Sequence, residues 1–368
     1  MTAASQAERE RLNATFAALC RILSPFGSEQ ACADYVAARL GELGLTGERD
    51  EIGNVLYRLG NGDGDGDGVM LCAHLDTVVP QAEIDPVVVD DGWENRHAGI
   101  LGADNKAAVA MLLEVATRRA ALPLPVELLF TVREESGLEG ASAFDTGRLR
   151  SRFGYVFDHA TPIGEIIVAS PTAYRLEAEF HGTAAHAGIR PEDGRNAIVA
   201  AAKAIAAMPF GRIDAETTAN VGRIEGGSAS VNVVADSCRV EAECRSLDAE
   251  RADVLIAELV DHVHDGANAA ECDVDVMVHR LYEGYRKRAS EQGVQVAEQA
   301  LRACGYAPTY VASGGASDAN AFEAAGFHCV NLANGTERAH ETTERVSLLA
   351  LEGMLDVTYA LLDACARC

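Results

Sequence analysis

The stretch Leu71-Cys-Ala-His-Leu-Asp-Thr77 joins an apolar run to a histidine and an aspartate. The apolar run is typical of a strand inside a sheet, and His74 and Asp76, two residues apart, are expected to project from the same side of it. Ligands and catalytic groups collect where the strands of open α/β sheets end. The stretch therefore predicts a functional site at a sheet edge, although an ordinary strand end with polar residues would look the same.

Segments with helical spacing alternate with extended segments along the chain, which favours an α/β fold. We expect helices at 5–23, 29–43, 104–119, 137–146, 194–208, 249–265, 290–304, 318–325 and 346–364. We expect strands at 47–59, 68–75, 125–132, 153–158, 165–170, 174–180, 216–224, 229–234, 237–245, 272–280, 308–311 and 328–332. The run of Gly and Asp at 61–68 lies between the first two strands and predicts a flexible hairpin loop, because it lacks the glutamate that closes a calcium loop.

The pattern changes after Thr172. Between Tyr174 and Phe180, apolar and polar residues alternate, as in an antiparallel strand with one exposed face. Two helices and one antiparallel sheet are expected over residues 173–283, after which the α/β pattern returns. We therefore predict a first domain formed by residues 1–172 and 284–368, into which residues 173–283 are inserted as a second domain.

Composition limits what the protein binds and where it works. The 368 residues include 31 Lys and Arg against 56 Asp and Glu, which gives a formal net charge of −25. This sign argues against nucleic acid and against anionic membrane surfaces as partners. No apolar run approaches 18 residues, no secretory signal opens the chain and the ten cysteines are scattered, so we expect a cytoplasmic protein with reduced thiols. Cys365 and Cys368 have the spacing of a redox or zinc pair, but no second pair accompanies them.

Four further polar clusters follow expected strands or open an expected helix. Asp104 stands at a helix start, where an N-cap is the simplest role. Glu134 and Glu135 end an apolar strand as adjacent carboxylates, which is costly without a cation between them, although a solvated charge pair is an equal alternative. Asp158 ends another strand, and His340 lies in a polar loop before the last helix.

Taken together, these clusters indicate metal chemistry. A set of nitrogen and oxygen ligands large enough for two divalent ions is formed by His74, Asp104, Glu135, Asp158 and His340. Imidazole combined with carboxylate suits Zn²⁺, Mn²⁺ or Co²⁺ better than Ca²⁺. Two ions about 4 Å apart need a bridging carboxylate, and they activate a water near neutral pH. Glu134 remains as the acid that would take the proton of that water.

The order of these motifs resembles a known superfamily. His-x-Asp at 74–76, Gly-Ala-Asp-Asn-Lys at 102–106, Glu-Glu-Ser-Gly at 134–137 and the later Asp158 and His340 are similar to the motifs of the co-catalytic zinc exopeptidases, which include peptidase T, aminoacylase and glutamate carboxypeptidase. The resemblance spans nearly the whole chain. It implies a mixed-sheet catalytic domain with two metal ions, and an inserted α+β, ferredoxin-like lid domain.

The resemblance also implies how the metal ligands divide. Asp104 would bridge the two ions. The remaining ligands would form two pairs, His74 with Asp158 on one ion and Glu135 with His340 on the other. The ions would be zinc, with cobalt or manganese as alternatives.

Further roles near the metals are implied in the same way. Glu134 would be the general base of a peptide hydrolysis by metal-activated water. Asp76 would orient His74. The peptide bond between Asp104 and Asn105 would be cis.

The expected lid has its own implied residues. In the Ala-His-Ala-Gly motif at 185–188, His186 corresponds to a lid histidine that reaches the scissile carbonyl. Asn232 and Arg245 correspond to lid residues that hold the polar groups and the carboxylate of the substrate, and arginine suits a carboxylate because it binds with two parallel hydrogen bonds. Gly315 lies in a glycine-rich run that resembles the substrate loop of the superfamily.

The lid motif most resembles that of the peptidase T-like branch, which implies an aminopeptidase for short peptides. Cleavage from the carboxyl end, or deacylation of N-acyl amino acids, would use the same metals and remains an alternative. A binding protein without activity would have lost the base or a ligand, and all six of these positions are filled. Members that dimerise through the lid extend the lid histidine into the partner's site, so we expect a homodimer in which His186 serves the other chain.

Overall fold

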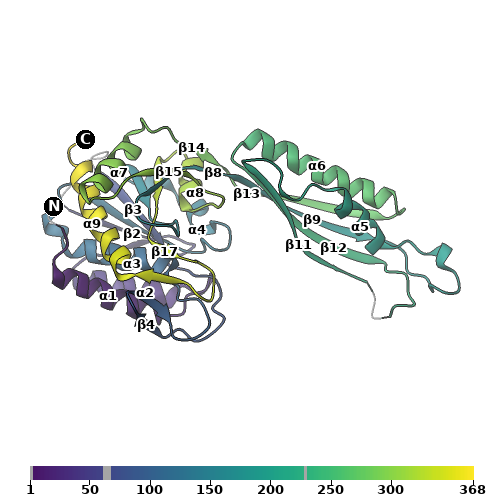
Figure 1. Cartoon of the computed structure of the whole chain (residues 1–368), viewed down its shortest axis with the longest axis horizontal. Coiled ribbons are helices and arrows are strands. Elements are labelled where there is room, and N and C mark those ends of the chain that lie inside the picture. The colour runs from purple at the N-terminus through teal and green to yellow at the C-terminus, as the bar shows by residue number, and fades with distance from the viewer. Residues whose placement is uncertain (1–2, 61–67, 228–229) are drawn as a thin grey trace. The chain divides into compact units, whose positions relative to one another are not determined.

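The structure is a computed structural model that describes residues 3–60, 68–227 and 230–368. The chain divides into two compact units. The first unit consists of Met1–Ala169 and Arg286–Cys368, and the second consists of Ser170–Tyr285. The first unit is therefore built from both ends of the chain, whereas the second is one continuous segment (Figure 1).

A nine-stranded mixed sheet lies at the centre of the first unit. Four parallel strands form its middle, in the order β6 (Val126–Thr131), β3 (Gly68–His74), β7 (Ser151–Val156) and β16 (Cys329–Leu332). Both β3 and β6 are buried along their whole length, which explains their nearly continuous apolar sequences. The outer strands are β2 (Val55–Leu59) and β1 (Glu48–Arg49) on one side, and β8 (Glu165–Ser170), β14 (Tyr285–Arg286) and β15 (Thr309–Ala312) on the other.

Helices pack around this sheet within a few residues of the expected positions. They are α1 (Gln6–Cys20), α2 (Gln30–Glu42), α3 (Ala103–Thr117), α4 (Glu139–Ala143), α7 (Gln292–Ala303), α8 (Asp318–Ala324) and α9 (Leu348–Cys365). Nearly all of α3 is buried, because it packs against β3 on one side and against α1, α2 and α9 on the others. The predicted mixed-sheet α/β fold is confirmed. None of the helices within the described ranges is long and apolar enough to cross a membrane.

The predicted hairpin between the first two long strands is wrong. β6 lies between β2 and β3, and it pairs antiparallel with β2 and parallel with β3. The apolar sequence of β6, which is buried along its whole length, suits this central position. The run at 61–67, which we expected to form the hairpin loop, lies outside the described residues.

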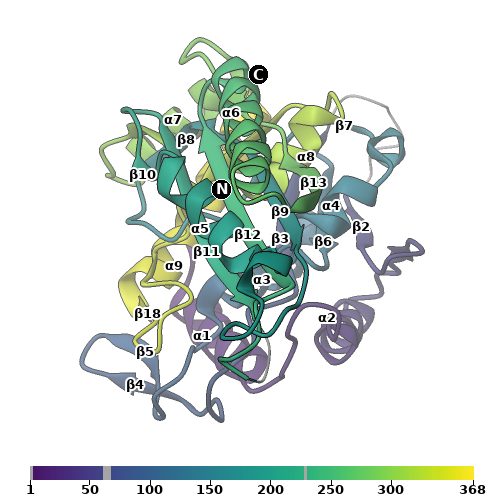
Figure 2. The ribbon, with the colours of Figure 1, turned by 90° about the vertical axis from the view of Figure 1, so that its right-hand side faces the viewer.

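A second, short sheet of the first unit was not predicted. Its strands have the order β17 (Thr336–Glu337), β18 (Arg345–Ser347), β5 (Gly92–Asn95) and β4 (Pro86–Val89), and Figure 2 shows β4, β5 and β18 close together beside α9. Strands this short carry too few residues for an alternating pattern to stand out. The sheet matters for function because the loop between β17 and β18 carries His340.

The second unit has one antiparallel sheet and two helices. The strand order is β10 (Gly211–Arg212), β11 (Thr217–Gly226), β12 (Ser237–Ser246), β9 (Thr172–His181) and β13 (Asp273–Tyr282). Figure 1 shows α5 (Ala197–Ala207) and α6 (Ala249–Asn268) on one face of this sheet, and alternate residues of β9 and β12 are buried beneath them. The strand expected at 229–234 is wrong for its described residues, because Ser230 accepts a turn hydrogen bond from Val233 N and only an isolated bridge joins Val233 to His186.

Candidate metal centre

His74 is the last residue of β3 and is almost completely buried. Its Nδ1 lies 3.0 Å from the main-chain oxygen of Asp76. Its Nε2 has no hydrogen-bond partner among the described residues, and it lies 3.5 Å from Asp104 Oδ1 and 3.6 Å from Asp158 Oδ1. A ring that is held through one nitrogen and presents the other to carboxylates has the arrangement of a metal-binding histidine.

Asp104 lies between two histidines. Its Oδ1 is 3.5 Å from His74 Nε2, and its Oδ2 is 3.6 Å from His340 Nε2. The Oδ1 atom is buried without a hydrogen-bond partner in the described part of the chain. Asp104 and Asn105 interrupt the start of α3 with non-helical φ and ψ, and the carboxylate of Asp104 faces the two histidines, so the simple capping role is wrong. The peptide bond from Asp104 to Asn105 is cis, as the resemblance implied.

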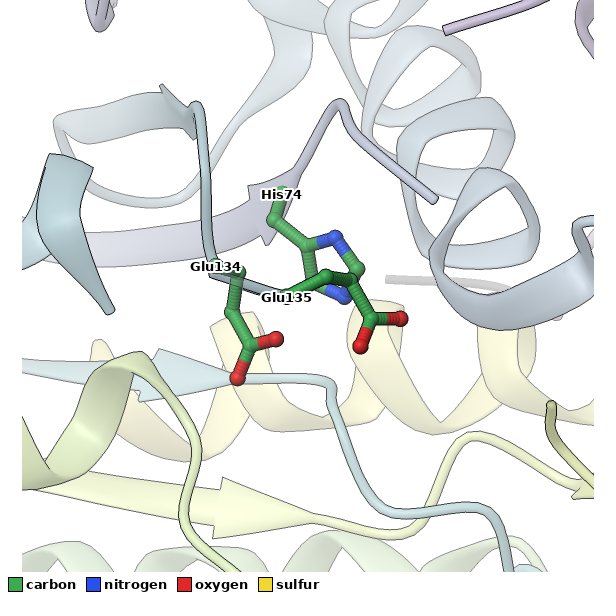
Figure 3. Close-up of side chains that lie close together, drawn as sticks. All are labelled: His74, Glu134 and Glu135. Carbon is green, nitrogen blue, oxygen red and sulfur yellow. The ribbon is translucent and has the colours of Figure 1, made fainter. Parts of the chain in front are cut away.

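Glu134 and Glu135 lie in the loop that follows β6. Asp76 holds this loop, because its two carboxylate oxygens accept the main-chain N–H groups of Glu134 at 3.1 Å and Glu135 at 3.0 Å. Figure 3 shows that the two glutamate side chains diverge beside His74. The Oε1 of Glu135 lies 2.8 Å from His340 Nε2. The adjacent glutamates therefore form no solvated charge pair, since they face the histidines.

Asp158 and His340 approach from other strands. Asp158 lies two residues beyond β7. Its main-chain N–H donates to Oδ1 of Asn331 on β16 at 3.0 Å, and its main-chain oxygen accepts a hydrogen bond from Nδ2 of the same residue at 2.8 Å. His340 comes from the loop between β17 and β18, adopts a left-handed φ of 68°, and has a side chain that is 50% exposed. The carboxyl ends of three parallel strands and one loop of the short sheet thus meet at one place.

Among the residues that the structure describes, three groups of side chains have possible ligand atoms within 4.8 Å of one another. These groups are His74 with Asp104 and Asp158, Asp104 with Glu135 and His340, and His74 with Glu134 and Glu135. The first two share Asp104, and they contain the buried unpartnered atoms of His74 and Asp104. Nitrogen and oxygen donors in this arrangement fit two divalent metal ions.

The electrostatics of the cluster also favour cations. Burial, reinforced by the charge of Asp158, raises the pKa of Glu134 well above its usual range. Burial likewise raises the pKa of Glu135 and that of Asp158. The hydrogen bond to Glu135 raises the pKa of His340 to about 9. Carboxylates crowded together in this way are costly as anions, and positive charge among them offsets that cost.

The remaining predicted site residues lie apart from this cluster in the chain. Gly315 precedes α8, and its N–H bonds Ser313 Oγ at 3.0 Å. In the second unit, exposed His186 and exposed Asn232 lie in neighbouring segments, joined by a hydrogen bond of 2.8 Å from Ala187 N to the oxygen of Asn232. Arg245 lies on β12, with Nη2 3.0 Å from Glu243 Oε2.

Sequence reasoning missed two buried acids beside the cluster. Asp318 Oδ2 accepts a hydrogen bond of 2.5 Å from Thr131 Oγ1 at the end of β6, and burial raises the pKa of Asp318 to about 7. Glu344 accepts three main-chain N–H groups from the loop that contains Asp104. Asp318 is the first residue of α8 and Glu344 lies in the loop that carries His340, but contacts with a distant segment leave no signal in local spacing.

Comparisons with known proteins place this arrangement in a family. The peptidase dimerisation domain of the M20 family matches residues 170–271, and peptidase family M28 matches residues 54–180. The protein YqjE of Bacillus subtilis is 34% identical, over 97% of this chain and 99% of that protein. The crystal structure of aminopeptidase PepT from Bacillus cereus is 36% identical with a TM-score of 0.86, covering 97% of this chain and 99% of that chain. A tripeptidase structure from Staphylococcus aureus is 32% identical with a TM-score of 0.91, covering 98% and 99%.

The chain belongs to the M20 peptidase family, in its peptidase T-like branch. In this M20 peptidase, the match to the family's dimerisation domain lies entirely within the second unit. The match to peptidase family M28 covers the segment that contains all residues of the cluster except His340. The resemblance stated from the motifs is therefore confirmed, and the protein is a peptide hydrolase.

Proposed function

We propose that this peptidase holds two divalent metal ions and removes amino-terminal residues from short peptides. The observation that carries the proposal is the carboxylate of Asp104, whose two oxygens face His74 and His340. A carboxylate that presents one oxygen to each of two histidine-containing groups suits a bridge between two ions.

The ligands are divided between the two ions in the same way as the two candidate groups that share Asp104. His74 and Asp158 hold one ion, and Glu135 and His340 hold the other. The set combines imidazole with carboxylate, which suits zinc, with cobalt or manganese as alternatives. When bound, such ions polarise the scissile carbonyl and lower the pKa of water toward 7.

Glu134 is the general base. It accepts a proton from the attacking water and delivers it to the leaving amine, which is the role of a carboxylate whose pKa lies above its usual range. It lies beside His74 and Glu135 without belonging to either group around Asp104. Asp76 supports it by holding its main-chain N–H at 3.1 Å.

The second unit supplies the substrate contacts and the dimer. The match to the peptidase dimerisation domain supports a homodimer formed through this unit. Exposed His186 then stabilises the oxyanion in the site of the other chain. Asn232 and Arg245 bind the polar groups and the carboxylate of the peptide, and the loop of Gly315 lines the site in the first unit.

The proposal that the enzyme cleaves peptides from the amino end rests on its similarity to named relatives. The solved structures with the highest identities given above are named an aminopeptidase and a tripeptidase. An aminopeptidase must accept a free α-amino group, whereas an aminoacylase or a carboxypeptidase accepts a blocked one.

A matched set of substrates tests the proposal. The protein, reconstituted with Zn²⁺, Co²⁺ or Mn²⁺, is incubated with one tripeptide in free, N-acetylated and C-amidated forms, and with an N-acetyl amino acid, and products are read by mass spectrometry. We expect the free and the C-amidated peptides to lose their first residue and the N-acetylated compounds to persist. Release of acetate, or of the last residue from the N-acetylated peptide, would instead establish the aminoacylase or the carboxypeptidase.

A further inference from the structure

Glu344 is a buried acid whose carboxylate accepts hydrogen bonds from the main-chain N–H groups of one distant loop. Its Oε2 accepts the N–H of Leu101 at 2.8 Å and that of Gly102 at 2.7 Å, and its Oε1 accepts the N–H of Asp104 at 3.0 Å. Asp104 and Glu344 are 240 residues apart in the chain. Only 3% of Glu344 is exposed, so these bonds are shielded from water.

The loop that Glu344 holds has an irregular backbone. Gly102 has a left-handed φ of 75°, and Asp104 and Asn105 have non-helical φ and ψ within the first turn assigned to α3. Main-chain N–H groups of a buried irregular segment need acceptors from elsewhere in the protein. Glu344 accepts three of them. The buried ammonium of Lys106, one turn further along α3, adds an attractive charge.

Glu344 also belongs to the segment that carries His340. Its own N–H bonds the main-chain oxygen of Glu341 at 3.0 Å, which closes a tight turn after His340, and the next residue begins β18. One carboxylate therefore joins the loop of Asp104 to the loop of His340. These two residues belong to the same candidate metal group, together with Glu135.

We infer that Glu344 is a positioning residue of the metal centre, which sets the spacing between Asp104 and His340 and thereby the affinity for the second ion. The inference rests on the two-metal site proposed above. Glu344 is not itself a ligand, because both of its oxygens already accept main-chain N–H groups and because it belongs to none of the candidate ligand groups among the described residues. Residues that orient metal ligands typically contribute 10–100-fold to metal affinity or activity.

The substitution Glu344→Gln tests this role with little change in shape. An amide keeps one acceptor oxygen, so its NH₂ must face either the N–H of Asp104 or those of Leu101 and Gly102. Glu127 provides the matched control, because it is 4% exposed and its Oε2 also accepts three hydrogen bonds, from Arg150 N, Ser151 N and Ser151 Oγ. It stands near the start of β6, whereas the cluster follows the end of that strand.

The measurement is the affinity of the metal-free proteins for Zn²⁺, obtained by competition with a chelating dye, together with the urea midpoint of each metal-free protein. We expect Glu344→Gln to bind the first equivalent nearly as wild type does and the second about 10–100-fold more weakly. Its kcat should fall at limiting Zn²⁺ and recover in excess Zn²⁺. Glu127→Gln should show a lower urea midpoint with unchanged Zn²⁺ binding.

The outcomes separate the inference from the proposed function. If wild type binds two equivalents and Glu344→Gln binds both with unchanged affinity, the positioning role is wrong. An equal loss of Zn²⁺ binding in Glu127→Gln would also overturn it, because the effect would then be a general loss of stability. If wild type itself fails to bind two equivalents, the two-metal proposal is what fails. Glu344→Asp, one methylene shorter, serves as a second variant if Glu344→Gln does not fold, and the same weakening is expected.

Discussion

The Oδ2 of Asp76 accepts a hydrogen bond of 3.0 Å from the main-chain N–H of Glu135. Its Oδ1 accepts the N–H of Glu134, while the main-chain oxygen of the same aspartate contacts the ring of His74. We expected Asp76 to orient His74. Its carboxylate lies 3.5 Å from His74 Nδ1 and makes its closest contacts with the glutamate loop. One fully buried aspartate thus ties the end of β3 to the loop after β6.

Replacing Asp76 by asparagine should therefore loosen the glutamate loop. The amide keeps one acceptor and turns a donor toward the N–H of Glu134 or Glu135. We expect kcat/KM to fall about 10–100-fold, with weaker Zn²⁺ binding. Asp248→Asn is the control, because Asp248 also accepts two main-chain N–H groups, at the start of α6 in the second unit. Steady-state kinetics and metal content check both variants, and wild-type values for Asp76→Asn would contradict the account.

Glu134 and Glu135 are adjacent, yet substituting each of them by glutamine should have a different effect. Glu134→Gln removes the proton acceptor and keeps the shape, so we expect two metals per chain and a kcat lower by about 10²–10⁴-fold. Glu135→Gln removes a ligand beside His340, so we expect reduced metal content. Elemental analysis beside the activity assay distinguishes them. Metal loss in Glu134→Gln with full metal in Glu135→Gln would reverse the two assignments.

The lid histidine offers a test of the homodimer. We expect His186→Ala to keep its metals and to lose about 10²–10³-fold in kcat, the usual effect of removing one oxyanion donor. If His186 serves the partner's site, mixing His186→Ala with Glu134→Gln should restore part of the activity, because subunit exchange creates a site with both residues intact. A monomer by light scattering, with no recovery in the mixture, would exclude a shared site.

Stability should depend on an ion pair far from the site. Glu8 accepts two hydrogen bonds from Arg118, at 2.5 and 2.7 Å, and this pairing holds the pKa of Glu8 far below its usual range. A carboxylate with a lowered folded-state pKa stabilises the fold above its unfolded pKa of about 4.3, and this contribution is lost as the pH falls toward the folded value. We expect Glu8→Gln to lower the free energy of unfolding by about 1–3 kcal/mol at pH 7.

Urea denaturation between pH 7 and pH 3 checks this expectation. The difference between wild type and Glu8→Gln should stay constant down to about pH 5 and shrink below it. The control is Glu10→Gln, because Glu10 is exposed on the same helix. A difference that does not change with pH would show that the charge of Glu8 is not its cause.

The sequence predicts the candidate site better than it predicts the surrounding topology. His74, Glu134 and Asp158 each lie at or just beyond the end of an apolar strand, and parallel strands bring such ends to one edge, so their meeting could be expected. The position of β6 between β2 and β3 could not be expected, because an apolar sequence does not specify which strand it pairs with. The short strands around His340 have too few residues for a recognisable pattern, so the sequence did not predict the strands that flank the loop of His340.

The sequence also could not predict the roles of buried polar side chains near the site. Glu344 and Asp318 look like ordinary acids in polar stretches, and their importance comes from contacts with segments far along the chain. His186, Asn232 and Arg245 were named from motifs alone, and all three lie in the second unit. Their roles toward the first unit remain predictions.

The central claim is that Asp104 bridges two ions, and the number of metals bound by its variants tests this most directly. Metal-free wild type, Asp104→Ala and Asp158→Ala are each titrated with Zn²⁺ by calorimetry, and bound metal is counted by elemental analysis. We predict two ions per chain for wild type, one for Asp158→Ala, and loss of both from Asp104→Ala, with the fold intact by circular dichroism. Two ions on Asp104→Ala, or fewer than two on active wild-type enzyme, would contradict the claim.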